Sequence, residues 1–589
     1  MELLILAILG VLVIALATAV APKLNIAGPL ILVLIGIGVG LLPFVSVPQI
    51  NPEFILVGVL PPLLYSAAVA LPAIEFRRDF RPIAGLSFVL VILSSVLLGL
   101  FLMVAIPGLD LAIAVALGAI LSPTDAVATS IVKRLGVSGR VVTMLEGESL
   151  LNDATALVLL RTMIATAAIA TANSATEDAE VGVGFLPAFA WGVLVALVVG
   201  AVVGYLNLRL RSLIGHSAAN TAVGFVIPFV AYIPTEELGG SGLVAAVVAG
   251  IVTGQGSARW FTPEQRMSDE HNWRTIELML EGAVFLIMGL ELKEIVTGNV
   301  ERHNGIGTGL MIAAGALAIL LIVRAAYVAV LVAAQGRRAR GRRRERLEQI
   351  GERIDEISAS PTLPTRRGRR SEERSTDDPR ARRRLASMRN RVARSLSDLD
   401  YYQASPLGWK HGAVIVWAGM RGVVTLAAAQ TLPRETPERE LLIFIAFSVA
   451  VGSLMLQGFT LPWVVRMLRL QSSGDSPLDR AEQLELDDRL REAAASALFD
   501  PALRRRDGHP FPEELVTRAG SRLIDPPDDE TTAAARDLLE LRLVLIDAMR
   551  RRLNELSSGG EFSTAALRHA LAELDADQLS LELRLDDEE

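Results

Sequence analysis

Long apolar runs separated by short polar breaks fill most of this chain. About 20 consecutive apolar residues cross a bilayer as a helix, and by this rule we count about thirteen predicted spans. They cover approximately residues 2–21, 28–46, 54–71, 82–106, 109–132, 141–170, 185–209, 217–234, 240–257, 272–291, 306–335, 410–431 and 440–468. Soluble proteins of this length do not carry so many such runs. The pattern therefore predicts an all-α polytopic membrane protein.

The charges of the loops predict how the chain is oriented. If the N-terminus lies outside, the inner loops hold Lys23 and the Lys and Arg residues of 77–81, 133–140, 209–211 and 259–274. The outer loops near 46–53, 107–110, 171–184 and 234–240 contain no Lys or Arg. This alternation follows the positive-inside rule. We expect a multi-pass protein of the inner (plasma) membrane, with its N-terminus outside and its C-terminus in the cytoplasm.

Composition divides the chain into four parts. Residues 1–335 are predicted to form the first part of the transmembrane domain, and residues 406–470 its last two helices. Between them, the insert 336–405 holds roughly twenty Arg against about eleven Asp and Glu, a composition typical of disorder. It is either a solvated linker or, over 336–394, a segment that contacts anionic lipid headgroups; without interleaved aromatic residues, nucleic-acid binding is not expected. Residues 471–589 are predicted to form a helical cytoplasmic tail. This tail is either a regulatory or dimerising module or a solubilising segment.

Two polar blocks interrupt the apolar spans, and the first is Ser122-Pro123-Thr124-Asp125. A carboxylate inside a membrane is costly and indicates a functional site. Pro123 removes a backbone donor, and with Gly118 one turn earlier it predicts an interrupted helix. Such a break is tolerated where it lines a cavity or is buried in protein, and its freed oxygens can bind a small cation together with Thr124 and Asp125. The alternative is a simple kink in which Asp125 caps the following half-helix.

The second block, residues 146–153, contains Ser149, Asn152 and Asp153 in the sixth span. Residues three and four apart share a helix face, so Ser149 and Asp153 can offer oxygens to one hard cation such as Na⁺. Asn152 can donate hydrogen bonds without adding charge. Burial favours the neutral form of Asp153 and a bound cation favours its ionised form, so a proton and a cation would compete for it. The predicted cation and proton site comprises Asp153, Asp125, Thr124, Ser149 and Asn152, with Na⁺ at Asp125, Ser149 and Asp153.

Glu148 lies on a different helix face and needs a partner, because an unpaired buried charge is costly. Arg421, in another apolar span, needs one too, so we predict a structural ion pair between Glu148 and Arg421. Glu277 and Glu281, one turn apart, either face a cavity or pair with Arg324.

These motifs resemble those of a known family. Thr124-Asp125 in an interrupted helix, the block from Glu148 to Asp153 and Gly419-x-Arg421-Gly422 resemble the sodium/proton exchanger family. Among its members, they are similar to the bacterial proteins of the first monovalent cation:proton antiporter group. The resemblance covers roughly residues 10–468.

The resemblance implies a homodimer of inverted-repeat protomers, each with a dimerisation part and a moving part. It places the cation on Asp125, the Thr124 carbonyl, Ser149 and Asp153, and it matches Glu148 and Arg421 to the family's ion pair. It associates Asn152-Asp153 with electroneutral exchange. One departure is Ser66 in the third span, where some relatives carry a glutamate nearby; whether Ser66 replaces that ligand stays open.

Other function classes find little support in the sequence. The chain has no cysteine, which excludes disulfides and thiolate sites. It has no HExxH helix, phosphate-binding glycine loop or nucleophile elbow, so we expect no enzyme and no cofactor. The sequence predicts a sodium/proton antiporter that works by alternating access around Asp153, for cytoplasmic pH and sodium homeostasis. The alternatives are a potassium/proton antiporter, a cation channel or sensor on the same fold, and a membrane-bound enzyme.

Overall fold

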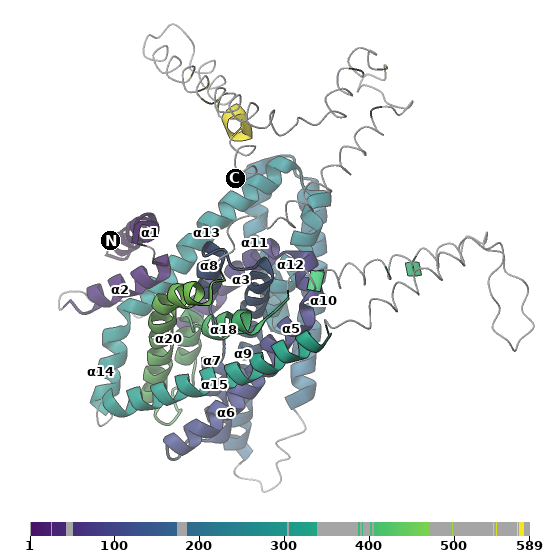
Figure 1. Cartoon of the computed structure of the whole chain (residues 1–589). Coiled ribbons are helices and arrows are strands. Elements are labelled where there is room, and N and C mark those ends of the chain that lie inside the picture. Colours follow the sequence, from purple (N-terminus) through teal and green to yellow (C-terminus); the bar gives the residue numbers. More distant parts are fainter. Residues whose placement is uncertain are drawn as a thin grey trace, which may run out of the picture. The chain divides into compact units, whose positions relative to one another are not determined.

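The computed structural model describes residues 2–24, 26–42, 51–173, 185–302, 306–338, 401–402, 406–470 and 576–581, with a few further residues of the insert and tail. Residues 1–473 form one compact unit and 474–589 a second. The expectations for most of the insert and tail fall outside the described residues. The elements of the described ranges are all helices, so the chain is an all-α membrane protein (Figure 1).

The helices begin and end close to the predicted spans. In chain order they are α1 (Glu2–Leu24), α2 (Gly28–Gly40), η1 (Phe54–Val59), α3 (Leu60–Ala70), α4 (Ala73–Arg78), α5 (Phe80–Ala84), η2 (Gly85–Val89), α6 (Leu90–Ala105), α7 (Leu111–Leu121), α8 (Val127–Arg134), α9 (Gly139–Asn173), α10 (Phe185–Ser212), α11 (Ser217–Glu237), α12 (Gly242–Trp260), α13 (Pro263–Leu290), α14 (Leu292–Arg302), α15 (Ile306–Arg338), α18 (Trp409–Trp417), α19 (Val423–Gln430) and α20 (Arg439–Leu468). The segments η1 and η2 are π-helical.

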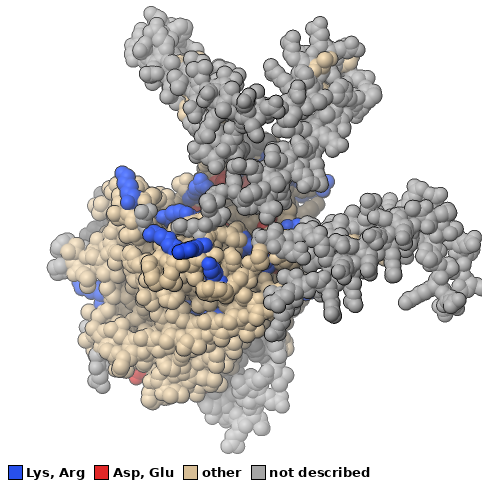
Figure 2. Space-filling model, in the orientation of Figure 1, with Lys and Arg blue, Asp and Glu red and all other residues tan. Residues whose placement is uncertain are grey.

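Within the described ranges, seven helices are long and apolar enough to cross a membrane, and four shorter helices are also apolar. Figure 2 shows the corresponding surface, a wide face with few charged side chains below a region where Lys and Arg gather. The chain is thus a multi-pass membrane protein. The count of thirteen spans stays a prediction, as does the inverted repeat.

The helices divide into two sets according to which of them pack together. The first set comprises α1, α2, η1, α3, α10, α11, α12 and α13. The second set comprises α5 to α9 with η2, together with α15, α18, α19 and α20. The short helices α4 and α14 contact helices of both sets. Both polar blocks of the sequence, on α7–α8 and α9, belong to the second set.

Glycines allow close helix packing at two places that matter here. A Cβ at Gly36 of α2 would lie 2.4 Å from the Leu286 carbonyl oxygen of α13. A Cβ at Gly118 would lie 2.2 Å from the Ser95 carbonyl oxygen of α6. Gly118 therefore lies inside α7 and serves its packing on α6, whereas the break that the sequence predicts begins after Leu121.

The end of the basic insert lies against the start of α9. Tyr401 donates a hydrogen bond to Asp79, at 3.3 Å from its hydroxyl oxygen to Oδ2. The Arg140 guanidinium, paired with Asp79 at 2.8 Å, lies 4.7 Å from the centroid of the Tyr402 ring. Arg140 also donates to Gln335 near the end of α15, at 2.8 Å. The end of the insert and residue Gln335 of α15 thus contact the same buried pair.

Replacing Gly36 with Val should destabilise the protein, because the added side chain would force α2 away from α13. Overpacking of this kind costs about 1–3 kcal/mol. Thermal unfolding in detergent should show a lower Tm for Gly36→Val than for the control Gly38→Val. A Cβ at Gly38 meets no atom within 4 Å. Equal Tm values would contradict the close α2–α13 contact.

Candidate functional site

Two helices of the second set are broken at the same place in the structure. The first break separates α7, which ends at Leu121, from α8, which begins at Val127, and it contains Pro123. This confirms the predicted interruption. The second break separates α18 from α19, between Trp417 and Val423, and the sequence analysis treated this region as one continuous span. The signal for it was a charged residue between two glycines, Gly419-Met420-Arg421-Gly422.

The two breaks contact each other directly. The backbone N–H of Asp125 donates to the Met420 carbonyl, at 2.8 Å from nitrogen to oxygen. The Asp125 carboxylate lies against Gly422, where an added Cβ would overlap its Oδ2 at 1.5 Å. Glycine is therefore required at position 422 to let the two breaks approach.

The charged residues where the two breaks meet match the polarity of the neighbouring helix ends. Arg421 donates to the carbonyl oxygens of Leu121, at 3.1 Å, and of Gly419. These carbonyls lie at the C-terminal ends of α7 and α18, where a helix carries partial negative charge. Asp125 accepts a hydrogen bond from the Val127 N–H at the N-terminal end of α8, at 2.9 Å. Asp125 therefore caps the following half-helix, as the alternative interpretation expected, and it also faces the second break.

Helix α9 places its polar side chains against the first break. Ser149 donates to the Thr124 carbonyl oxygen at 3.1 Å, and the Asn152 amide donates to the Thr124 hydroxyl at 2.7 Å. Asp153 is 8% exposed and lies close enough to Asp125 for their charges to interact. No described residue forms a hydrogen bond with the Asp153 carboxylate. The five predicted site residues thus lie together around the break, with Asn152 in contact with Thr124.

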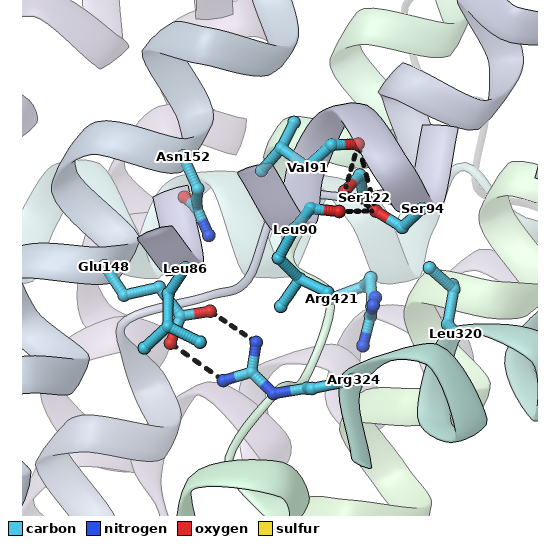
Figure 3. Close-up of a pocket in the computed structure, with 10 residues that line it drawn as sticks. All are labelled: Leu86, Leu90, Val91, Ser94, Ser122, Glu148, Asn152, Leu320, Arg324 and Arg421. Carbon is cyan, nitrogen blue, oxygen red and sulfur yellow. Dashed lines mark hydrogen bonds and ion pairs between the residues drawn. The ribbon is translucent and has the colours of Figure 1, made fainter. Parts of the chain in front are cut away.

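The structure gives Glu148 a different partner from the predicted one. Its carboxylate binds Arg324 of α15 through two contacts, one of them 2.8 Å between Oε2 and Nη2, and both residues are buried (Figure 3). Arg421 lines the same small pocket, but its hydrogen bonds go to carbonyls at the breaks. The prediction of a Glu148–Arg421 pair is therefore wrong as a direct contact. The prediction assumed that a buried arginine needs a carboxylate as its partner. Backbone carbonyls can also accept the hydrogen bonds of a buried guanidinium.

The two carboxylates of α13 are not paired with Arg324 either. Glu277 accepts a hydrogen bond from the Ser66 hydroxyl of α3. Glu281, one turn further along α13, lies close enough to Asp125 for the two charges to interact. Ser66 therefore binds a carboxylate of α13, a contact that the sequence analysis missed because its partner lies far along the chain.

The donor set around the break is suited to a monovalent cation. It comprises two carboxylates, two hydroxyls and a backbone carbonyl, all of them the hard oxygen ligands that such ions prefer. Among the described residues, no three His, Asp or Glu side chains gather as they would around a divalent metal.

Comparison with known proteins agrees with this geometry. The sequence profile of the sodium/hydrogen exchanger transmembrane domain matches residues 10–347 and 392–467, well over half of the chain. The chain belongs to the sodium/hydrogen exchanger family. The profile match spans both helix breaks and all the site residues described above.

Individual relatives extend the similarity beyond the transmembrane helices. A Mycobacterium tuberculosis protein described as an uncharacterised Na⁺/H⁺ exchanger is 25% identical, over 96% of this chain and 93% of its own length. The Na⁺/H⁺ antiporter NhaG of Bacillus atrophaeus is 26% identical, over 81% of this chain and 77% of its own. The fold is similar to that of the sodium proton antiporter MjNhaP1 of Methanocaldococcus jannaschii, with a TM-score of 0.54 at 15% identity, covering 80% of this chain and all of that one.

A double-mutant cycle should show which arginine holds Glu148 in this exchanger. Arg324→Ala leaves Glu148 buried without its partner and should cost about 3–5 kcal/mol of stability. In Glu148→Ala/Arg324→Ala the loss should be well below the sum of the two single losses. The coupling in Glu148→Ala/Arg421→Ala, from the same unfolding measurement in detergent, should be smaller. A larger coupling with Arg421 would contradict the pairing.

Proposed function

We propose that the protein exchanges one Na⁺ for one proton by alternating access around Asp153. One observation carries the proposal: Asp153 is almost fully buried, its carboxylate has no hydrogen-bonding partner among the described residues, and it lies beside a second carboxylate, Asp125. Two neighbouring carboxylates in a low-dielectric site cannot both stay ionised without a positive charge between them. A proton or a cation satisfies this requirement, and each displaces the other.

The residues around the break take separate roles in this proposal. Asp125 and Asp153 supply the charge that a cation needs. Ser149 now donates to the Thr124 carbonyl; a bound Na⁺ would take both oxygens as ligands once that hydroxyl hydrogen turned away. Asn152 holds the Thr124 side chain in position. The exchange is electroneutral in this proposal, as the resemblance of Asn152-Asp153 to the pattern of the family's electroneutral members implies.

The Glu148–Arg324 pair has a structural role. Both partners are buried and belong to the second set of helices. Their charges neutralise each other, and the pair holds α9 against α15. Breaking such a pair would leave an uncompensated buried charge. It therefore stays closed during exchange and takes no part in binding the transported ions.

The proposal also covers the transported cation, the membrane and the assembly of the protein. Names of the similar proteins, such as the Na⁺/H⁺ antiporter NhaG, support sodium as the cation. We place the protein in the plasma membrane as a homodimer, with its N-terminus outside, serving cytoplasmic pH and sodium homeostasis.

Everted membrane vesicles from an antiporter-deficient host test the proposal. A proton gradient is established and followed with a pH-sensitive dye, and sodium, lithium or potassium is then added. Sodium should release protons in wild type, and in Asp153→Asn the rate should fall at least about tenfold, because an amide neither carries the proton nor attracts the cation. Asp110→Asn is the matched control, since Asp110 only caps the exposed start of α7.

Other results of this assay would change the proposal. Proton release by potassium alone would make the protein a potassium/proton antiporter. If no cation releases protons at any pH from folded, inserted protein, the exchange proposal is wrong and a channel or sensor remains.

Replacing Gly422 with Ala should also reduce exchange. The new methyl group would occupy the space of the Asp125 carboxylate and push it out of the site. Gly452→Ala on α20 is the control, because a Cβ there meets no atom within 4 Å. In the vesicle assay Gly422→Ala should lose most of the sodium-dependent signal while Gly452→Ala keeps it. Equal rates would contradict the close approach of Asp125 to the second break.

A further inference from the structure

Polar contacts join helices of opposite sets in two places. In the first, Arg161 of α9 pairs with Glu236 at the end of α11. In the second, the Gln430 amide at the end of α19 donates to the Glu291 carboxylate, which follows α13, at 2.7 Å. Each contact thus links the helices that carry the site to the helices of the first set.

Both contacts lie at the same side of the predicted membrane. Glu236 and Glu291 are at the C-terminal ends of α11 and α13, and Gln430 is the last residue of α19. The loop charges place all three of these helix ends on the outer side. Arg161 lies about two turns beyond Asp153 along α9, towards the predicted outer loop. The two contacts therefore lie on the predicted outer side of the region that contains Asp125 and Asp153.

In each contact, one of the two residues also forms a hydrogen bond with a residue of its own helix set. Glu236 also accepts a hydrogen bond from the Gly242 N–H, at 2.8 Å, at the start of α12 in the first set. The Gln430 carbonyl accepts from Arg439 of α20, at 2.7 Å, in the second set. A movement of one set against the other would consequently be resisted at these two points.

We propose that these two contacts form an outer latch, which holds the two helix sets together while the site is closed to the outside and opens in each transport cycle. The inference rests on the proposed exchange function. The exposure of the first pair supports it, because the side chains of Arg161 and Glu236 are 48% and 26% exposed. A pair at the surface of the protein can separate without disturbing the packed interior. The buried Glu148–Arg324 pair, by contrast, lies within one set and need not open.

Disulfide trapping tests the latch directly, because the chain contains no cysteine of its own. The variants are Arg161→Cys/Glu236→Cys and Glu291→Cys/Gln430→Cys, oxidised in everted vesicles with a thiol oxidant. Each cross-linked variant should lose sodium-dependent proton release at least about tenfold, because it cannot leave the closed state. A reductant should restore the rate of the same sample.

A cross-link within one set is the matched control. The Ser241 N–H donates to the Gly192 carbonyl at 3.3 Å, and both residues lie at the outer end of the first set. A Cβ at Gly192 meets only the Gly239 carbonyl oxygen, at 3.8 Å. The backbone contact brings these two positions together and a cysteine fits at Gly192, so Gly192→Cys/Ser241→Cys should cross-link and continue to exchange ions.

The outcomes separate the latch from the exchange function. Undiminished exchange in the cross-linked latch variants would overturn the latch. Absence of cross-links in both latch pairs, while the control pair forms its own, would overturn it too, because the partners would then not meet in the membrane. If wild type shows no exchange, it is the proposed function that fails; the formation of both cross-links would still support the closed contact.

Discussion

The direct contact between the two helix breaks is the constraint on which the rest of the site depends. A break at membrane depth frees backbone groups that no water can satisfy, so each must find a partner inside the protein. Here the two breaks satisfy each other through the Asp125 N–H and the Met420 carbonyl. Arg421 neutralises two helix C-termini and Asp125 caps a helix N-terminus. The positions of the charged side chains therefore follow from the polarity of the half-helices.

This arrangement separates charges that are satisfied from charges that are not. Glu148 and Arg324 satisfy each other, and Arg421 is satisfied by carbonyls, so none of them needs an external ion. Asp153 has no such protein partner among the described residues, and it lies beside Asp125. The proposed exchange uses this difference, because the unsatisfied carboxylate is the one for which a proton and a cation compete. Two helix sets joined by few polar contacts would then allow access to alternate around it.

Much of the candidate site was predictable from local sequence. Pro123 between apolar residues predicted the first break, because proline cannot continue a helix without losing a hydrogen bond. The spacing of Ser149, Asn152 and Asp153 predicted neighbouring side chains in one helix. The structure places Ser149 and Asn152 against Thr124, and Asp153 beside Asp125. The second break was missed, although Gly419 and Gly422 mark it, because the apolar residues around them resemble a continuous span.

The sequence alone determined the membrane class, most helix boundaries and the residues that carry the chemistry, since hydropathy, helical periodicity and proline act over a few neighbouring residues. Only the tertiary structure decided the partners. It joined Glu148 to Arg324 across 176 positions and Ser66 to Glu277 across 211. It also placed Gln335 of α15 and Tyr402 of the insert against Arg140. Such pairings depend on which helices pack side by side, and a buried charge accepts any well-placed group of complementary polarity, so spacing along the chain cannot select among them.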